Sequence, residues 1–223
     1  MTFIISIVYV VIKIISAPTV AFESDVSIRV KGDYVLMLLQ CSFGLVAMLL
    51  PGYLQNKVRM NIPNAMMIAY AVFLFCAIYL GEVRDFYYVV PHWDVVLHIF
   101  SGAGLGALGF SVINLLNKSD TILFSLSNFF VALFAFCFAV TLGTVWEIYE
   151  FSVDFFLNTN MQKYALESGK LLVGKKAVVD TMKDLIVDAI GAFTVSATGY
   201  IAIRYKKGWF KRILIHYLNK ENK

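Results

Sequence analysis

Residues 121–146 read TILFSLSNFFVALFAFCFAVTLGTVW, a run without a single charged side chain. About 20 consecutive apolar residues are enough for a helix to cross the roughly 30 Å hydrocarbon core of a bilayer. This run is longer than that, and the first carboxylates beyond it are Glu147 and Glu150. The stretch therefore predicts a membrane-spanning helix that ends in acidic residues.

The rest of the 223-residue chain repeats this pattern. Of all residues, 60% are hydrophobic and 15% are charged, whereas soluble domains average about 45–50% and about 25%. We therefore expect an all-α polytopic membrane protein, a bundle of about six transmembrane helices in a single domain over residues 1–203. This composition excludes a soluble enzyme, a disordered chain and a disulfide-stabilised secreted domain. The predicted spans are residues 3–22, 34–54, 64–81, 94–116, 124–150 and 181–203.

Small residues are concentrated in the fourth predicted span. Gly102, Gly104, Gly106 and Gly109 lie there with several alanines. Glycines at this density let helices approach closely in lipid. The GxGxxG match within this run lies inside a span rather than after a strand, so we do not interpret it as a nucleotide-binding motif.

Acidic residues and one histidine gather at one end of each of the last three predicted spans. Within each patch the residues recur at helical spacing, which places them on one face of their helix. Because consecutive spans run antiparallel, these three ends lie at the same face of the membrane, and we predict one shared polar site. The patches are Asp94 and His98; Glu147, Glu150 and Asp154; and Asp180, Asp184 and Asp188.

Carboxylates within a span need a compensating interaction. Each charged residue at mid-helix costs about 2.5–3.5 kcal/mol on insertion scales, and a capping role accounts only for Asp94 and Asp180, where we expect helices to begin. Two carboxylates about 6 Å apart repel by roughly 3 kcal/mol at an effective dielectric constant of about 20. Either several carboxyls are protonated or a cation occupies the site. Carboxylates with one imidazole suit Mg²⁺, Mn²⁺, Zn²⁺ or Fe²⁺.

These considerations lead to an expected role for each residue of the site. The predicted metal ligands are Glu147, Glu150 and Asp184; the predicted catalytic acid–base pair is His98 with Asp94; Asp154, Asp180 and Asp188 are predicted to support the ligands; and Lys175 and Lys176 are predicted to attract an anionic headgroup.

The same residues resemble the motifs of the YjdF-like family of uncharacterised bacterial inner-membrane proteins and, more distantly, the VanZ-like family. The shared skeleton is D-x-x-x-H followed by small residues, then E-x-x-E or E-x-x-Q at a helix end, then an Asp, a second polar residue and Gly-Ala. Here these are Asp94 to His98, Glu147 to Glu150, and DLIVDAIGA over residues 184–192. Asp188 stands where the family often has Asn, and the arginine that VanZ-like proteins tend to carry before the last span is absent. The resemblance implies the fold and the polar site rather than a reaction.

The distribution of basic residues predicts the orientation. Residues 204–223 carry seven lysines and arginines against one acid, and the loop after the second span carries Lys57 and Arg59. Both segments lie on the same side of six spans, so the positive-inside rule makes that side cytoplasmic in a bacterial inner membrane. Both termini are then cytoplasmic and the polar site faces outward, although the lysines of the last outer loop oppose this orientation.

The end of the chain has an amphipathic composition. Apolar side chains between Trp209 and Leu218 alternate with basic ones, so residues 204–223 are expected to rest on the anionic inner leaflet as a helix or to form a solvated tail. The net charge of +4 comes largely from this end, so nucleic acid is not an expected partner.

Three functions fit these observations. The first is a metal-dependent hydrolase or transferase acting on a lipid headgroup or lipid-linked phosphate. The second is a lipid-binding membrane factor without catalysis. The third is a proton- or cation-coupled transporter, which is less favoured because the polar residues do not continue to the other membrane face. Membrane lipid is the expected partner in the first two.

Overall fold

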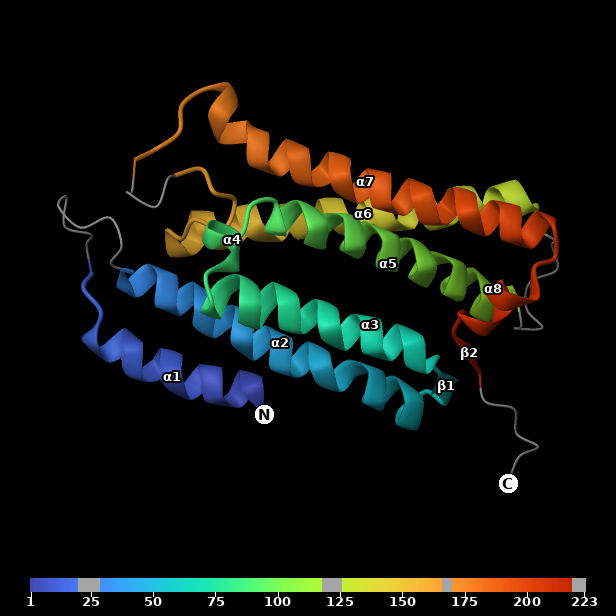
Figure 1. Ribbon diagram of the computed structural model, residues 1–223, viewed down its shortest axis with the longest axis horizontal. Coiled ribbons are helices and arrows are strands. Elements are labelled where there is room, and N and C mark those ends of the chain that lie inside the picture. The colour runs from blue at the N-terminus through green and yellow to red at the C-terminus, as the bar shows by residue number, and fades with distance from the viewer. Residues whose placement is uncertain (20–28, 118–125, 166–169, 218–223) are drawn as a thin grey trace.

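The computed structural model describes residues 1–19, 29–117, 126–165 and 170–217, which form long helices running along one axis (Figure 1). The predicted all-α polytopic architecture is confirmed, and one pair of two-residue strands is added to it. The predicted segments at 20–22, 124–125 and 218–223 lie outside the described residues. The elements are α1 (Thr2–Ser16), α2 (Lys31–Lys57), β1 (Met60–Asn61), α3 (Asn64–Leu74), the π-helix η1 (Phe75–Val83), α4 (Phe86–Val89), α5 (Trp93–Asn117), α6 (Asn128–Leu157), α7 (Lys175–Arg204), α8 (Gly208–Arg212) and β2 (His216–Tyr217).

Among the residues that the structure describes, five helices are long and apolar enough to cross a membrane, namely α2, α3 continued by η1, α5, α6 and α7. They match the second to sixth predicted spans. The first prediction is wrong in its length, because α1 has 15 residues and extends only about 22 Å at about 1.5 Å per residue. Its C-cap Ala17 has an extended backbone, which is the conformation that the following Pro18 favours.

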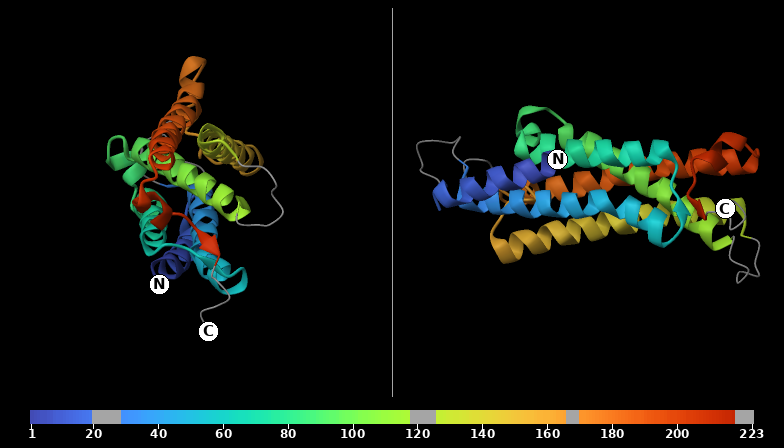
Figure 2. Two further views of the ribbon diagram at one scale, coloured as in Figure 1. Left: turned by 90° about the vertical axis from the view of Figure 1, so that its right-hand side faces the viewer. Right: turned by 90° about the horizontal axis from the view of Figure 1, so that it is seen from below.

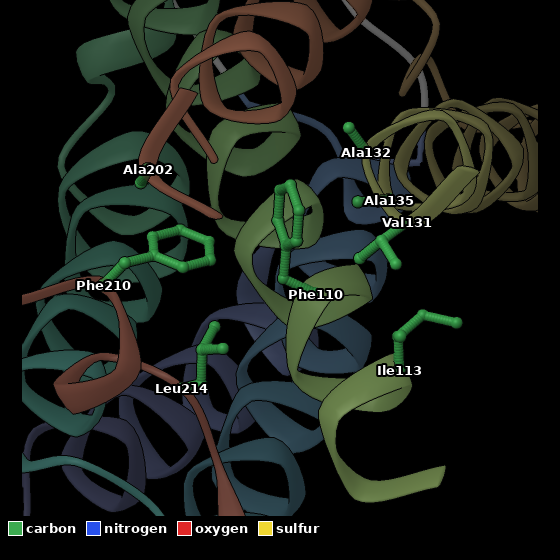
Figure 3. Close-up of a cluster of buried hydrophobic side chains, with 8 residues drawn as sticks. All are labelled: Phe110, Ile113, Val131, Ala132, Ala135, Ala202, Phe210 and Leu214. Atoms are coloured by element: carbon green, nitrogen blue, oxygen red, sulfur yellow. The ribbon is translucent and has the colours of Figure 1, made fainter. Parts of the chain in front are cut away.

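The helices form two sub-bundles, each with its own core. In the C-terminal sub-bundle, α5, α6 and α7 pack on one another around Phe110 and Ala135, and Figure 3 shows these side chains together with Phe210 of α8. In the N-terminal sub-bundle, α1, α2 and α3–η1 pack around Val10, Met37 and other buried residues. The two clusters share no residue among those described. The molecule is therefore two packed layers rather than one continuous core.

Two glycines allow α5 and α7 to pack backbone against backbone. A Cβ atom on Gly102 would collide with the carbonyl oxygen of Asp188, and a Cβ atom on Gly191 would collide with that of Ile99. The small residues thus do what was predicted of them at this crossing. Gly104 differs, since an added Cβ atom there would meet no atom within 4 Å.

The C-terminal segment packs on the protein instead of forming a long surface helix. Phe210, Leu214 and Ile215 are buried, and β2 pairs antiparallel with β1. Ile215 is held at both backbone groups: its N–H donates to Ser111 Oγ (3.2 Å), and its carbonyl accepts from Asn114 Nδ2 (2.9 Å). Over the described part of the tail the predicted helix is therefore limited to the five residues of α8, and several of its apolar side chains contact the bundle.

Candidate functional site

The three polar patches lie at one end of the bundle. The first turn of α5, the last turns of α6 and the first turns of α7 share that end, whereas α8 and the β1–β2 pair lie at the other (Figures 1 and 2). The site and the C-terminal segment are therefore at opposite ends of the molecule.

His98 is the centre of the contacts between the patches. Its Nδ1 lies 3.3 Å from Asp188 Oδ2, while its Nε2 lies 3.7 Å from Asp94 Oδ1 and 3.9 Å from Asp184 Oδ2. In the tautomer whose Nδ1–H donates to Asp188, the Nε2 lone pair faces the other two carboxylates. The close α5–α7 crossing at Gly102, one turn along from His98, places this ring against α7.

Three of these residues form a group that fits a metal ion. One ligand atom from each of Asp94, His98 and Asp184 lies within 4.8 Å of the others. Carboxylate and imidazole ligands bind such ions at about 2.0–2.2 Å, so these three side chains could hold one ion between them. Glu147 and Glu150, two of the predicted ligands, lie outside this group.

Buried carboxylate oxygens next to this group lack donors. Glu147, Asp184 and Asp188 are 4%, 2% and 3% exposed. Both oxygens of Glu147, and Oδ1 of Asp184 and of Asp188, have no hydrogen-bond partner in the described part of the chain. An unpaired buried carboxylate is costly, and a proton or a cation would stabilise it.

Asp154 organises the loop that follows α6. Its carboxylate accepts hydrogen bonds from Thr159 Oγ1 (2.6 Å) and from the backbone N–H groups of Met161 (2.7 Å) and Gln162 (2.8 Å). Asn158 ends the helix in the left-handed conformation, which turns the chain back. Asp154 was predicted to support ligands, and the structure shows it supporting this loop.

The loop places Lys163 in the site. Its Nζ lies 2.5 Å from Asp94 Oδ2 and 3.7 Å from Asp180 Oδ2. Burial alone lowers the pKa of Lys163, but the neighbouring carboxylates outweigh this effect and the pKa is raised above its usual value. Lys163 is therefore a fixed cation in the site. Sequence reasoning missed it because a loop residue has no helical spacing to connect it with Asp94.

The remaining predicted residues are placed differently. Glu150 accepts a hydrogen bond from Trp146 Nε1 (2.8 Å). Lys175 and Lys176 are exposed at the start of α7 and do not line the cavity described next. Glu82 lies in η1 and lines this cavity, because the helix continues beyond residue 81, where the third predicted span ends.

A cavity of about 660 Å³ joins this site to the space between the sub-bundles. Its polar end contains Asp94, His98, Asp184 and Lys163. From there it continues along α5 as far as Leu108, fourteen residues or about 21 Å at about 1.5 Å per residue. The group formed by Asp94, His98 and Asp184 therefore opens into a long cavity whose far part is apolar.

The sequence model of the family described as "Predicted membrane protein (DUF2238)" matches residues 3–205 of this chain. The chain belongs to this family. The matched region contains every predicted site residue from Asp94 to Asp188. An uncharacterized protein of Thermotoga maritima is 29% identical over 162 residues, which cover 71% of this chain and 72% of that protein. No solved structure matches the chain.

Proposed function

We propose that this protein is a divalent-metal-dependent hydrolase or transferase that acts on the phosphate of a membrane lipid or lipid-linked phosphate. The observation that carries the proposal is the group formed by Asp94, His98 and Asp184, which faces a cavity shared with Lys163. Two carboxylates, one imidazole and a nearby cation suit a metal that binds and polarises an anionic phosphate.

In this proposal the metal ligands are His98 Nε2, Asp94 Oδ1 and Asp184 Oδ2. Asp188 accepts from the other ring nitrogen of His98, and such a carboxylate–histidine–metal arrangement fixes the ring and makes it a better ligand. Asp94 and His98 thus act as ligands instead of as the acid–base pair expected from the sequence. Asp94 has its second oxygen on Lys163, so it connects the metal to the cation.

The reaction follows from these positions. A metal held by these residues would supply an activated water and offset negative charge on the phosphate. Glu150, a cavity-lining carboxylate held by Trp146, would accept the proton of the attacking water. The water oxygen would bond to phosphorus as the phosphorus–oxygen ester bond breaks, and the leaving alcohol would take the proton from Glu150. Lys163 would offset the charge of the phosphate oxygens. In a transferase, an acceptor alcohol replaces the water.

The setting of the reaction is part of the proposal. The resemblance to YjdF-like proteins agrees with the family membership and supports a bacterial cytoplasmic membrane. The basic residues of the C-terminal segment support cytoplasmic termini and a site at the outer face. The second candidate is lipid binding without catalysis, which the long apolar part of the same cavity favours.

Release of phosphate from hexadecyl phosphate tests the proposal. Protein stripped with EDTA in mild detergent should release inorganic phosphate only after Mg²⁺, Mn²⁺, Zn²⁺ or Fe²⁺ is added. Asp184→Asn should abolish release, because it removes a charged ligand. Asp33→Asn removes an exposed carboxylate at the start of α2 and should release phosphate like the wild type. Metal-dependent binding without release would support the lipid-binding function, and the absence of any metal response would overturn the proposal.

A further inference from the structure

We infer that the ligand of this site is a single-chain amphiphile, with an anionic phosphate at the polar end and one long hydrocarbon chain in the apolar part of the cavity. The position of the phosphate rests on the proposed function, whereas the position of the chain rests on the cavity itself. We call this apolar part the apolar limb, and its walls include Leu50 and Leu54 of α2, Met66 and Phe73 of α3, and Gly104 and Leu108 of α5.

The apolar limb and the polar end belong to one continuous cavity. A molecule that fills it must therefore be charged at one end and apolar along the rest. The lining of the limb comes from both sub-bundles, and Phe73 of α3 stacks on Phe100 of α5, with ring centroids 5.9 Å apart, where the sub-bundles meet. A hydrocarbon chain there would cover apolar surface of both layers, which have separate cores.

The dimensions indicate one long chain. The cavity extends about 21 Å along α5, which exceeds the depth of one leaflet, about 15 Å or half of the hydrocarbon core. Its volume of about 660 Å³ is within the about 300–1,000 Å³ of pockets that enclose one small ligand. A single chain fits these limits better than the two chains of an ordinary phospholipid.

The far end of the limb is bounded by the C-terminal segment. Ile213 and Ile215 line the cavity there together with Ile62. Ile215 is held by the hydrogen bonds from its backbone to Ser111 and Asn114. The C-terminal segment thus closes the apolar limb, and the end of the hydrocarbon chain would contact it.

Gly104 gives a way to block the limb without disturbing the packing. It lines the cavity, and an added Cβ atom would meet no atom within 4 Å. A leucine there would therefore occupy the space of the chain. Gly52 of α2 is a matched control, because a Cβ atom added there also meets nothing within 4 Å, and Gly52 does not line the cavity.

Native mass spectrometry of the full chain in mild detergent tests the inference with defined probes. Hexadecyl phosphate should bind once per chain, more tightly than hexadecanol, inorganic phosphate or dipalmitoyl phosphatidic acid. Gly104→Leu should lower the affinity for hexadecyl phosphate by about tenfold, a typical effect of adding methylenes to a space that is already filled. Gly52→Leu should bind hexadecyl phosphate like the wild type. Leu108→Trp narrows the same limb and should give the same loss, provided that each variant keeps the wild-type melting temperature.

The outcomes separate the two proposals. Equal binding by the wild type and both limb variants, or tighter binding of the two-chain phosphatidic acid, would overturn the inference. Inorganic phosphate bound as tightly as hexadecyl phosphate would also overturn it, because the chain would then contribute nothing. Binding that is sensitive to Gly104→Leu but identical with EDTA and with Mn²⁺ supports the chain position and counts against the metal. If phosphate release depends on metal and is the same in Gly104→Leu as in the wild type, the result supports the reaction. It then counts against the proposed position of the hydrocarbon chain.

Discussion

At the residue scale, the site depends on how His98 uses its two ring nitrogens. Helical spacing predicted that His98 and Asp94 share a face, and this is where the structure places them. The sequence had no signal that Nδ1 would meet Asp188 while Nε2 faces Asp184. Which carboxylate each ring nitrogen contacts depends on how α7 is shifted and rotated against α5. The crossing at Gly102 sets this position, and hydropathy does not encode it.

The contact between His98 and Asp188 leads to a graded prediction for two neighbouring carboxylates. Asp188→Asn keeps an acceptor for Nδ1–H but removes the charge, so affinity for Mn²⁺ or Zn²⁺ should fall about 10–100-fold, as is typical for residues that orient a ligand. Asp184→Asn should abolish binding. Isothermal titration of EDTA-treated protein measures both. Unchanged affinity in Asp188→Asn would mean that this carboxylate does not act through His98.

Lys163 is predicted to compensate charge in the metal-free protein. Lys163→Met leaves Asp94 and Asp180 without their cation, so the free energy of unfolding should fall by about 1–3 kcal/mol in EDTA. Mn²⁺ should recover more stability in this variant than in the wild type, because it replaces the lost charge. Thermal unfolding with and without Mn²⁺ measures the effect, and Lys170→Met, at an exposed loop residue, is the control. Equal unfolding of both variants would contradict this role.

At the scale of elements, apolar length located the long helices. The helices α2, α5, α6 and α7 contain almost all of their predicted spans. The predicted bounds and surroundings differ from the structure where something other than apolar length sets them. Pro18 follows the end of α1, the π-helix brings Glu82 into the cavity, and Phe210 packs on Phe110 instead of on lipid. An apolar face does not reveal whether it meets lipid or protein, since lipid tails are as apolar as leucine.

The packing of α5 on α7 gives a matched pair of glycine substitutions. Gly102→Ala places a methyl group against the backbone of α7 and should destabilise the protein by about 1–3 kcal/mol. Gly104→Ala, two residues along the same helix, meets no atom and should be neutral or stabilise by up to about 1 kcal/mol, because alanine favours helix. Denaturation in mild detergent compares them. Equal stability of the two variants would show that the backbones of α5 and α7 do not approach as closely at Gly102 as described here.

At the scale of the whole molecule, two layers enclose one cavity with distinct ends. The sequence predicted that the polar ends of three spans form one site, because consecutive antiparallel helices place those ends at the same membrane face. It did not predict the apolar limb, since that space depends on how the N-terminal sub-bundle sits on the C-terminal one. Glu82 and Lys163 belong to the site through this arrangement and not through any motif.

The arrangement of the two ends also leads to a prediction about topology. The C-terminal segment lies at the end opposite to the site (Figure 1), and its basic residues favour the cytoplasmic side. A reporter fused after Lys223 should therefore be active only in its cytoplasmic form. Activity of a periplasmic reporter at that position would place the site on the cytoplasmic face.

The central claim, that the polar end is a metal centre, is tested most directly by elemental analysis of protein purified in mild detergent without chelator. We predict about one divalent metal ion per chain in the wild type, held by the three ligands Asp94, His98 and Asp184. Asp184→Asn should lose this metal, and Asp33→Asn should retain it. Wild-type protein with no more metal than Asp184→Asn, even after incubation with Mn²⁺ or Zn²⁺, would contradict the account.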